Sequence, residues 1–150
     1  RESGGIEMNN FELLGKHISE IDEVLDTWID LKFALNYNHF AVLYCLAGAE
    51  SGQCTQKQIC DEWYIPKQTV FNICKEFREK GWIEFYPSST DKRERIMKLT
   101  NEGKVQAEPI YKATTEMFEN AFNVFGKQKS SQLFALMSEF SQICRDVMNK

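Results

Sequence analysis

The sequence lacks a long apolar segment and a secretion signal. None of its 150 residues belongs to an uninterrupted apolar run of about eighteen, the length that a membrane-spanning helix needs. Residues 1–10 lack the basic and then apolar order of a signal peptide. We therefore expect a soluble, cytoplasmic protein with no membrane partner. Residues 1–9, which include the first methionine, Met8, are expected to be disordered or a remnant of cloning.

Cysteine and histidine are too few and too scattered to predict a disulfide framework or a metal centre. The five cysteines form no Cys-x-x-Cys pair, and His17 and His39 are the only histidines. We expect no metal, no cofactor and mostly buried, reduced thiols. Cys54 leaves a thiol-based redox-sensing regulator open as an alternative, because it precedes a helix start whose dipole could lower the pKa of the thiol.

Signatures of catalysis are missing as well. The sequence has no glycine-rich phosphate loop and no evident set of nucleophile and base, so we do not expect an enzyme. What it does contain is 43% hydrophobic and 13% aromatic residues, enough to bury one core in a chain too short for two ordinary domains. The composition therefore predicts a single compact domain.

Charge is distributed unevenly along the chain. The net charge is −4, but residues 67–98 hold eight basic and five acidic side chains. A basic face on an acidic protein binds phosphates, while the acidic remainder limits non-specific adhesion. The distribution favours nucleic-acid binding, with ordinary solvated charges as the alternative.

Two helices are predicted before the basic region. In residues 10–34 apolar side chains recur every three or four positions, which indicates an amphipathic helix that cannot bury its stripe alone. The stripe consists of Phe11, Leu14, Ile18, Ile21, Leu25 and Trp28. Residues 38–49 are almost entirely apolar, which predicts a central helix, and turn residues follow it.

Two shorter helices separated by a tight turn come next. Thr55 and Gln58 have the spacing of a capping box, which predicts the start of the first. Pro66 suits the first position of the second, because its missing N–H has no intrahelical partner to lose. We predict this second helix over residues 66–80. The arrangement is that of a helix-turn-helix.

The helix predicted over residues 66–80 has one apolar and one polar face, as a helix in the DNA major groove requires. Gln68 and Asn72 lie one turn apart on the polar face, and each amide can make paired hydrogen bonds to an adenine. Thr69 or Phe71 can touch a thymine methyl group. An ordinary amphipathic surface helix is the alternative.

A β-hairpin is predicted after this helix. Residues 82–86 and 95–99 alternate as strands do, and turn residues separate them. Near the tip, Asp91 precedes Arg93 by two residues and can hold its guanidinium extended for a narrow minor groove. A plain turn with a surface ion pair is the alternative. With the hairpin as a wing, the sequence predicts a winged helix-turn-helix that binds double-stranded DNA.

Two further helices are predicted at the carboxyl end. Thr100 can cap a helix that reaches about residue 125, and residues 129–149 form another with an apolar stripe. This stripe consists of Leu133, Leu136, Met137, Phe140, Ile143, Cys144 and Val147. The stripes at the two ends of the chain have only each other and a partner subunit to cover them. We therefore expect a homodimer, with a helical monomer as the alternative.

The predicted fold class is mainly α with a small β-wing. Residues 35–100 are expected to form the winged helix-turn-helix lobe that binds DNA. Residues 10–34 and 101–150 are expected to supply N- and C-terminal dimerisation helices on either side of it.

Several motifs carry a resemblance to a known family. The segments IPKQTV and DKRERIMKLTNEG, with the order of elements in residues 38–103, resemble the MarR family of bacterial transcriptional regulators. The spacing from the wing aspartate and arginine to Leu99, Thr100 and Gly103 is the most specific part. The resemblance implies a homodimer that binds a palindromic operator, acts as a repressor and is released by a small ligand or an oxidant.

The resemblance also assigns roles to residues. It makes Arg93 the wing arginine and Asp91 its orienting partner, and it makes Gln68, Thr69 and Asn72 contacts of the recognition helix. The full set of expected DNA contacts is Thr55, Gln56, Lys67, Gln68, Thr69, Asn72, Lys75, Asp91, Lys92, Arg93 and Arg95.

A ligand pocket is expected where the first, second and fifth helices meet, a junction that members of this family use. Its aromatic candidates suit a small aromatic or phenolic ligand, and they are Trp28, Tyr37, Phe40, Tyr44 and Tyr111. Aromatic residues at helical spacing are more often part of a core, which is the alternative. A winged-helix protein-interaction module without DNA binding also stays open as the function.

Overall fold

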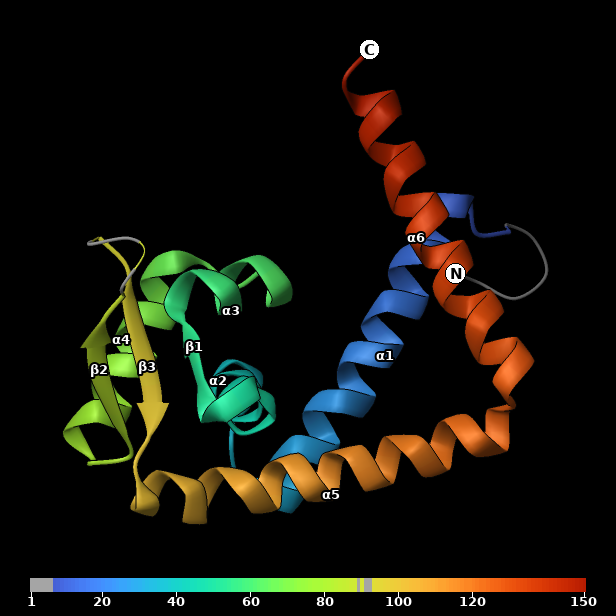
Figure 1. The fold of residues 1–150 in the computed structure, drawn as a ribbon. Coiled ribbons are helices and arrows are strands. Elements are labelled where there is room, and N and C mark those ends of the chain that lie inside the picture. Colours follow the sequence, from blue (N-terminus) through green and yellow to red (C-terminus); the bar gives the residue numbers. More distant parts are fainter. Residues whose placement is uncertain (1–6, 89, 91–92) are drawn as a thin grey trace. The chain divides into compact units, whose positions relative to one another are not determined.

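The computed structural model describes residues 7–88, 90 and 93–150. These residues form two compact units, which divide between Tyr111 and Lys112. Figure 1 shows the chain as a ribbon with its helices and strands labelled. The elements, in chain order, are α1 (Asn10–Phe33), α2 (Tyr37–Gly48), the 3₁₀ helix η1 (Glu50–Gly52), β1 (Gln53–Thr55), α3 (Gln56–Trp63), α4 (Lys67–Glu79), β2 (Ile83–Pro87), β3 (Arg95–Leu99), α5 (Asn101–Phe125) and α6 (Lys127–Met148).

This architecture confirms the fold class predicted from the sequence, mainly helical with a small β-wing. Within the described ranges, none of the helices combines the length and the apolar character that crossing a bilayer requires. The division into dimerisation and DNA-binding segments concerns function as well as folding, and it stays a prediction.

The first two helices begin at asparagine caps. The Asn9 side chain accepts a hydrogen bond from the Glu12 backbone N–H at 2.9 Å, and the Glu12 carboxylate accepts one from the Asn9 N–H at 3.0 Å. Asn36 caps α2 by accepting from the His39 N–H at 2.8 Å. Each cap satisfies backbone donors that the first turn of a helix leaves exposed. Both helices lie within one residue of the predicted bounds.

The capping box predicted for α3 is confirmed. The Thr55 hydroxyl accepts from the Gln58 N–H at 3.1 Å, and the Gln58 amide oxygen accepts from the Thr55 N–H at 2.8 Å. Pro66 was predicted as the first helical residue of α4, and this is wrong by one position. Its ψ of 141° is extended, so Pro66 is the N-cap, whose carbonyl accepts the Val70 N–H at 3.1 Å.

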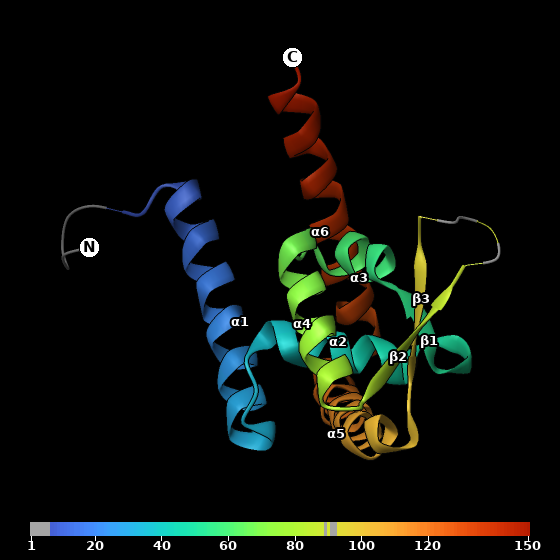
Figure 2. The ribbon, with the colours of Figure 1, turned by 90° about the vertical axis from the view of Figure 1, so that its left-hand side faces the viewer.

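The predicted hairpin is confirmed and belongs to a sheet of three strands in the order β1-β3-β2 (Figure 2). β2 and β3 are antiparallel, with Ile83 opposite Leu99 and Phe85 opposite Met97. The sequence analysis missed β1, which pairs with β3 on the other side and places Cys54 opposite Met97. The short strand connects the wing directly to the start of α3.

The base of the wing is held by one threonine. The Thr100 hydroxyl accepts the Gly103 N–H at 3.0 Å, as expected of a helix cap, and donates to the Gly81 carbonyl at 2.6 Å. Gly81 has a φ of +80°, a conformation that glycine adopts without strain. Gly103 packs so closely on the Trp82 carbonyl that a side chain at this position would overlap it. Glycine at position 103 therefore lets α5 begin against the end of the α4–β2 turn.

The hydrophobic core lies in the first unit. It gathers residues from α1, α2, α3, α4, the sheet and the start of α5, and its most completely buried large side chains are Phe77, Ile29, Leu43, Leu46, Ile59, Ile83 and Met97. Burial of this apolar surface is the main force that fixes α4 on α2 and α3.

The second unit contains the rest of α5 and all of α6. The two helices meet at Gly126, whose carbonyl accepts a hydrogen bond from the Ser130 hydroxyl at 2.8 Å, and Phe122 packs on Phe134 with ring centroids 5.3 Å apart. The apolar stripe predicted on the last helix is exposed, including Leu136 (63%), Met137 (58%) and Phe140 (49%). A helix that leaves such a stripe uncovered in the single chain has room for a partner.

Candidate nucleic-acid interface

Helix α4 separates its side chains into a buried and an exposed face. Val70 and Cys74 are fully buried, and Phe77 is 1% exposed. The residues predicted to contact bases or phosphates lie on the other face, where Lys67, Gln68, Asn72 and Lys75 are exposed and Thr69 is half-buried. The packing of the inner face therefore orients the outer face toward solvent.

Gln68 and Asn72 are joined by a hydrogen bond along the outer face of α4. The Gln68 Nε2 donates to the Asn72 Oδ1 at 3.1 Å, across one helical turn. Each amide keeps further donor and acceptor capacity, because one bond uses only part of what an amide offers. This capacity is what a base edge in the major groove requires.

A hollow of about 490 Å³ brings three elements of the predicted interface together. It is lined by Gln56, Lys57, Cys60, Asp61, Lys67, Arg93, Glu94 and Arg95, from α3, the start of α4 and the wing. Three of the cations predicted to contact DNA, Lys67, Arg93 and Arg95, thus lie around one depression. Lys57, which also lines the hollow, forms an ion pair with Asp61 at 2.6 Å.

Two of the residues predicted from α3 and its cap are less accessible than the rest. The Thr55 hydroxyl is engaged in the capping box, so Thr55 positions α3. The side-chain nitrogen of Gln56 is buried, and a base or phosphate contact from that nitrogen requires the side chain to turn outward. Sequence spacing alone does not reveal which way such a side chain points.

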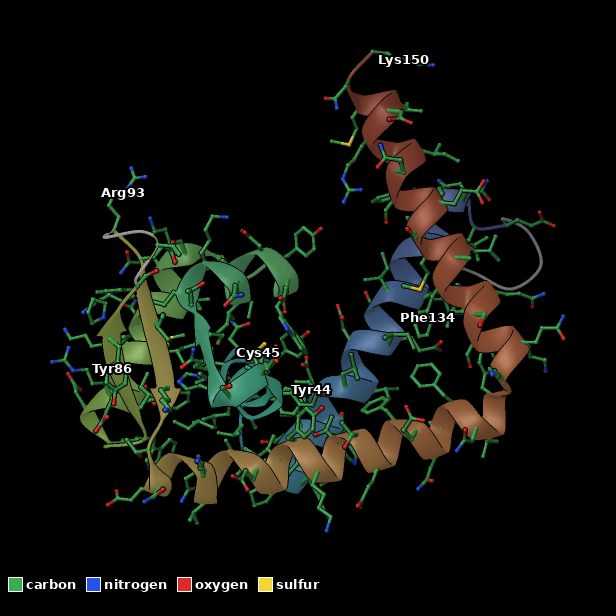
Figure 3. All side chains as sticks on the ribbon, in the orientation of Figure 1. Tyr44, Cys45, Tyr86, Arg93, Phe134 and Lys150 are labelled. Atoms are coloured by element: carbon green, nitrogen blue, oxygen red, sulfur yellow. The ribbon has the colours of Figure 1, made fainter. Side chains whose placement is uncertain are left out.

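The arginines of the wing differ in how their side chains are placed. Arg93 is exposed and projects from the end of the hairpin (Figure 3). Arg95 lies over the Phe85 ring with its guanidinium carbon 4.4 Å from the ring centroid, and Arg78 from α4 lies at 5.5 Å from the same ring. Cation–π contacts of this kind hold a guanidinium in place without neutralising it. Asp91 and Lys92, also predicted here, lie outside the described residues.

A hydrogen bond that sequence reasoning missed, between His39 and Glu76, links α2 to α4. His39 Nε2 lies 3.3 Å from a Glu76 carboxylate oxygen, and His39 Nδ1 lies 2.9 Å from the Asn36 side-chain oxygen. The hydrogen bond from His39 lowers the pKa of the Glu76 carboxyl below its ordinary value. Because the two partners are far apart in the sequence, no local pattern could have indicated this contact.

Three of the five cysteines lack the lowered thiol pKa that the redox alternative requires. Burial, together with the smaller effect of nearby Glu62, raises the pKa of the Cys54 thiol to about 12. The lowering considered for Cys54 is therefore wrong, because desolvation of the thiolate outweighs the helix dipole. Burial also raises the pKa values of Cys45 and Cys74 to about 12. Among the described residues, no group of three or more histidine, cysteine or acidic side chains is arranged to hold a metal ion.

Four of the five aromatic residues predicted to form a ligand pocket form a continuous series of ring contacts, but the five do not line one cavity. Phe40 packs on Tyr37 and Tyr44 at centroid distances of 6.3 and 5.7 Å and belongs to the core. Trp28 meets Phe33 edge-on at 5.3 Å. Tyr37 lines a separate hollow of about 550 Å³ with Asp26, Asp30, Ala34, Leu35, Asn36 and Asn38.

Tyr44 and Tyr111 line a different cavity of about 440 Å³, which we call the aromatic cavity. Its remaining lining residues are Cys45, Gly48, Ala49, Glu50, Gln53, Cys54, Gln58, Ile59, Glu62 and Trp63. The Tyr44 ring lies 4.9 Å from Tyr111 and 5.8 Å from Trp63, measured between centroids. Sequence analysis missed Trp63, because it reaches the cavity from α3 and not from the helices considered.

Comparison with known proteins adds to this geometry. The sequence pattern of the MarR family matches residues 34–94. A MarR family regulator from Neisseria meningitidis is 38% identical in sequence, with a TM-score of 0.84 over 95% of this chain and 100% of that chain. No protein with a curated description matches the sequence.

Two more distant structures share the fold. MepR of S. aureus, solved as a complex with DNA, is 19% identical, with a TM-score of 0.68 over 91% of this chain and 98% of that chain. NadR, solved in complex with 4-hydroxyphenylacetate, is also 19% identical, with a TM-score of 0.68 over 95% of this chain and 99% of that chain.

Proposed function

The chain belongs to the MarR family of transcriptional regulators, and from this premise we propose that it is a repressor that binds a palindromic DNA operator as a homodimer. In this proposal α4 enters the major groove and the β2–β3 wing reaches the adjacent minor groove. The observation that carries it is the convergence of Lys67, Arg93 and Arg95 around one hollow beside the exposed polar face of α4. The DNA complex of MepR, which shares the fold, supports it.

Each part of this surface fits a different part of DNA. The side chains of Gln68 and Asn72 can read base edges, while Lys67 and Lys75 flank them with charge for the phosphates. Arg93, at the end of the hairpin, suits the negative potential of a narrow minor groove. Base contacts give sequence preference, and phosphate contacts give affinity that falls with salt.

A second copy of the chain accounts for the exposed apolar stripes. In the single chain α1 exposes Phe11, Ile18 and Ile21, and α6 exposes Leu136 and Phe140. Stripes of this size are covered in stable assemblies, and a two-fold dimer is the commonest one. Two recognition helices about 34 Å apart would then meet successive major-groove faces of one operator.

We also propose that a small aromatic ligand releases the protein from its operator. The aromatic cavity lies beside α3, whose packing supports α4, and NadR shows that a protein of this fold binds 4-hydroxyphenylacetate. A ligand that binds better to a conformation unsuited to DNA weakens operator binding by the same coupling factor, typically about 5- to 150-fold.

Fluorescence anisotropy tests the proposal with DNA from the region upstream of the gene for this protein, at two salt concentrations. We expect Arg93→Ala to weaken binding and to reduce the slope of log affinity against log salt by about one. Lys104→Ala is the control, because it removes a charge from an exposed position on α5. Gln68→Ala should instead reduce the preference for operator over unrelated DNA. Equal affinity of wild type and Arg93→Ala would refute the wing contact, and flat anisotropy would favour a protein-interaction module.

A further inference from the structure

The aromatic cavity has three ring-bearing walls. Tyr44 contacts both of the other rings, with Tyr111 at 4.9 Å and Trp63 at 5.8 Å between centroids. The interplanar angles of 36° and 65° turn the three rings toward different directions. Its volume of about 440 Å³ is in the range of small-molecule sites.

Gly48 allows Tyr111 to occupy its place in this wall. The Tyr111 ring lies so close to the Gly48 Cα that a Cβ at position 48 would overlap the ring. Tyr111 therefore rests directly on the backbone of α2 and forms one wall of the cavity. Tyr44 and Tyr111 are close enough that Tyr111 adds to the effect of burial in raising the pKa of Tyr44. A raised pKa keeps the Tyr44 hydroxyl neutral at physiological pH.

The charged groups of the cavity have one sign. The described lining residues include the acidic Glu50 and Glu62 and no lysine, arginine or histidine. The negative charge of Glu62 is felt at the cavity wall, because it contributes to raising the pKa values of the Cys45 and Cys54 thiols. Both thiols therefore stay protonated and contribute no charge of their own.

We propose that the aromatic cavity binds a small aromatic cation, recognised by the rings of Tyr44, Trp63 and Tyr111 and by the carboxylates of Glu50 and Glu62. Aromatic faces attract a cation through their quadrupoles, most strongly for tryptophan. Two carboxylates add direct attraction for the same charge and repel an anion. This inference rests on the proposed function, since it names the chemical class of the releasing ligand.

Three phenols of different charge test the inference by isothermal titration calorimetry with the full chain. Tyramine is a cation, tyrosol is neutral, and 4-hydroxyphenylacetate, the ligand in the NadR structure, is an anion. All three carry the same 4-hydroxyphenyl ring. We expect tyramine to bind about tenfold more tightly than tyrosol, and 4-hydroxyphenylacetate to bind most weakly. Equal or tighter binding of either other phenol, or no heat from tyramine at millimolar concentration, would overturn the inference.

Charge-neutral variants locate the binding site. Glu62→Gln and Glu50→Gln keep the size of the side chain, and each should weaken tyramine binding several-fold while leaving the affinity for tyrosol unchanged. Glu79→Gln, at an exposed position on α4 outside the cavity lining, is the matched control and should leave all three affinities as in wild type. Unchanged tyramine affinity in the Glu50→Gln/Glu62→Gln double variant would place the cation elsewhere and refute the site.

Operator binding is measured separately, on protein without any phenol. If ligand-free protein binds the operator and tyramine does not bind, the inference fails and the proposed regulator stands. If tyramine binds as expected and no duplex is bound, the proposed regulator fails and the cation site stands.

Discussion

Phe77 and Phe140 carry the same side chain on two helices in different surroundings. Phe77 on α4 is 1% exposed, whereas Phe140 on α6 is 49% exposed. The contrast extends to their regions: all of the buried hydrophobic cluster except Ile29 lies between Phe40 and Ile110. The first unit, which ends at Tyr111, therefore completes its own core, whereas α6 supplies an apolar surface that the single chain does not cover. Losses of unfolding free energy caused by substitutions in this core should therefore not depend on protein concentration. Losses caused by substitutions on the α6 stripe should depend on it, because a partner chain would cover that stripe.

The largest effect is expected from truncation of the lobe core. Phe77→Ala should lower the free energy of unfolding by about 3–5 kcal/mol, because it removes a fully buried ring and leaves a cavity. Urea unfolding at two protein concentrations measures this, and the loss should be the same at both. Phe140→Ala is the matched truncation, and its effect should depend on protein concentration. A concentration-independent loss of similar size at Phe140 would break the comparison.

Introducing charged side chains into the α6 stripe should weaken the dimer more than it destabilises the fold of the single chain. In the double variant Leu136→Glu/Phe140→Glu, the carboxylates would be buried without partners in a dimer, and we expect dimer dissociation to become about 100-fold easier. Sedimentation velocity over a dilution series gives the dissociation constant. Ser138→Glu, on the opposite face of α6 by helical spacing, should leave it unchanged. A wild-type chain that sediments as a monomer at all concentrations would remove the basis for this prediction.

A substitution at the wing base should have an intermediate effect. Gly103→Ala places a Cβ against the Trp82 carbonyl, which must move, so we expect a loss of about 1–3 kcal/mol in the free energy of unfolding. Gly15→Ala in α1 is the control. With nothing within 4 Å of its new Cβ, it should stabilise the chain by about 0.5–1 kcal/mol through helix propensity. Thermal unfolding of both variants compares them, and equal destabilisation would refute the packing argument.

The smallest effect concerns the hydrogen bond between His39 on α2 and Glu76 on α4. The pKa of Glu76 is lowered in the folded chain from 4.5, chiefly by the hydrogen bond from His39. Its contribution to stability is therefore complete above pH 4.5 and is lost as the pH falls below that value toward the folded pKa. As the pH falls, we expect the urea midpoint to decrease less steeply in His39→Gln than in wild type. Urea midpoints between neutral pH and pH 3, a range of about four pH units, measure it.

His17→Gln is the control for this pH dependence. His17 is 66% exposed and lies 3.7 Å from Glu20 on the surface of α1, where an ion pair contributes little. Its acid profile should match that of wild type. An equally steep loss in His39→Gln would show that Glu76 does not carry the pH dependence.

Features that depend on local spacing could be predicted from the sequence. The Thr55–Gln58 capping box requires only residues three apart, and the alternation in the two hairpin strands requires only neighbours. The apolar face of α4 is set by the helical period, so the polar face could be predicted with it. This local information accounts for the fold class and for the exposed positions of Lys67, Gln68 and Asn72.

Features that depend on distant partners could not be predicted. β1 has three residues, too few for an alternating pattern, and it is a strand because β3 offers an edge to pair with. Trp63 joins Tyr44 and Tyr111 only through the packing of α3 on α2. The pKa of Cys54 is raised because tertiary burial outweighs the local helix dipole that the sequence suggests.

The hydrogen bond between Gln68 and Asn72 makes these two side chains one coupled unit. Part of the rotational freedom that each would lose on meeting a base is already lost in the unbound protein. Replacing Asn72 releases Gln68 as well, so the two losses of binding energy will not add in a double-mutant cycle. In the proposed interface this coupling would tie the reading of one base pair to the reading of its neighbour, so a variant selected for a changed operator position should carry changes at both residues.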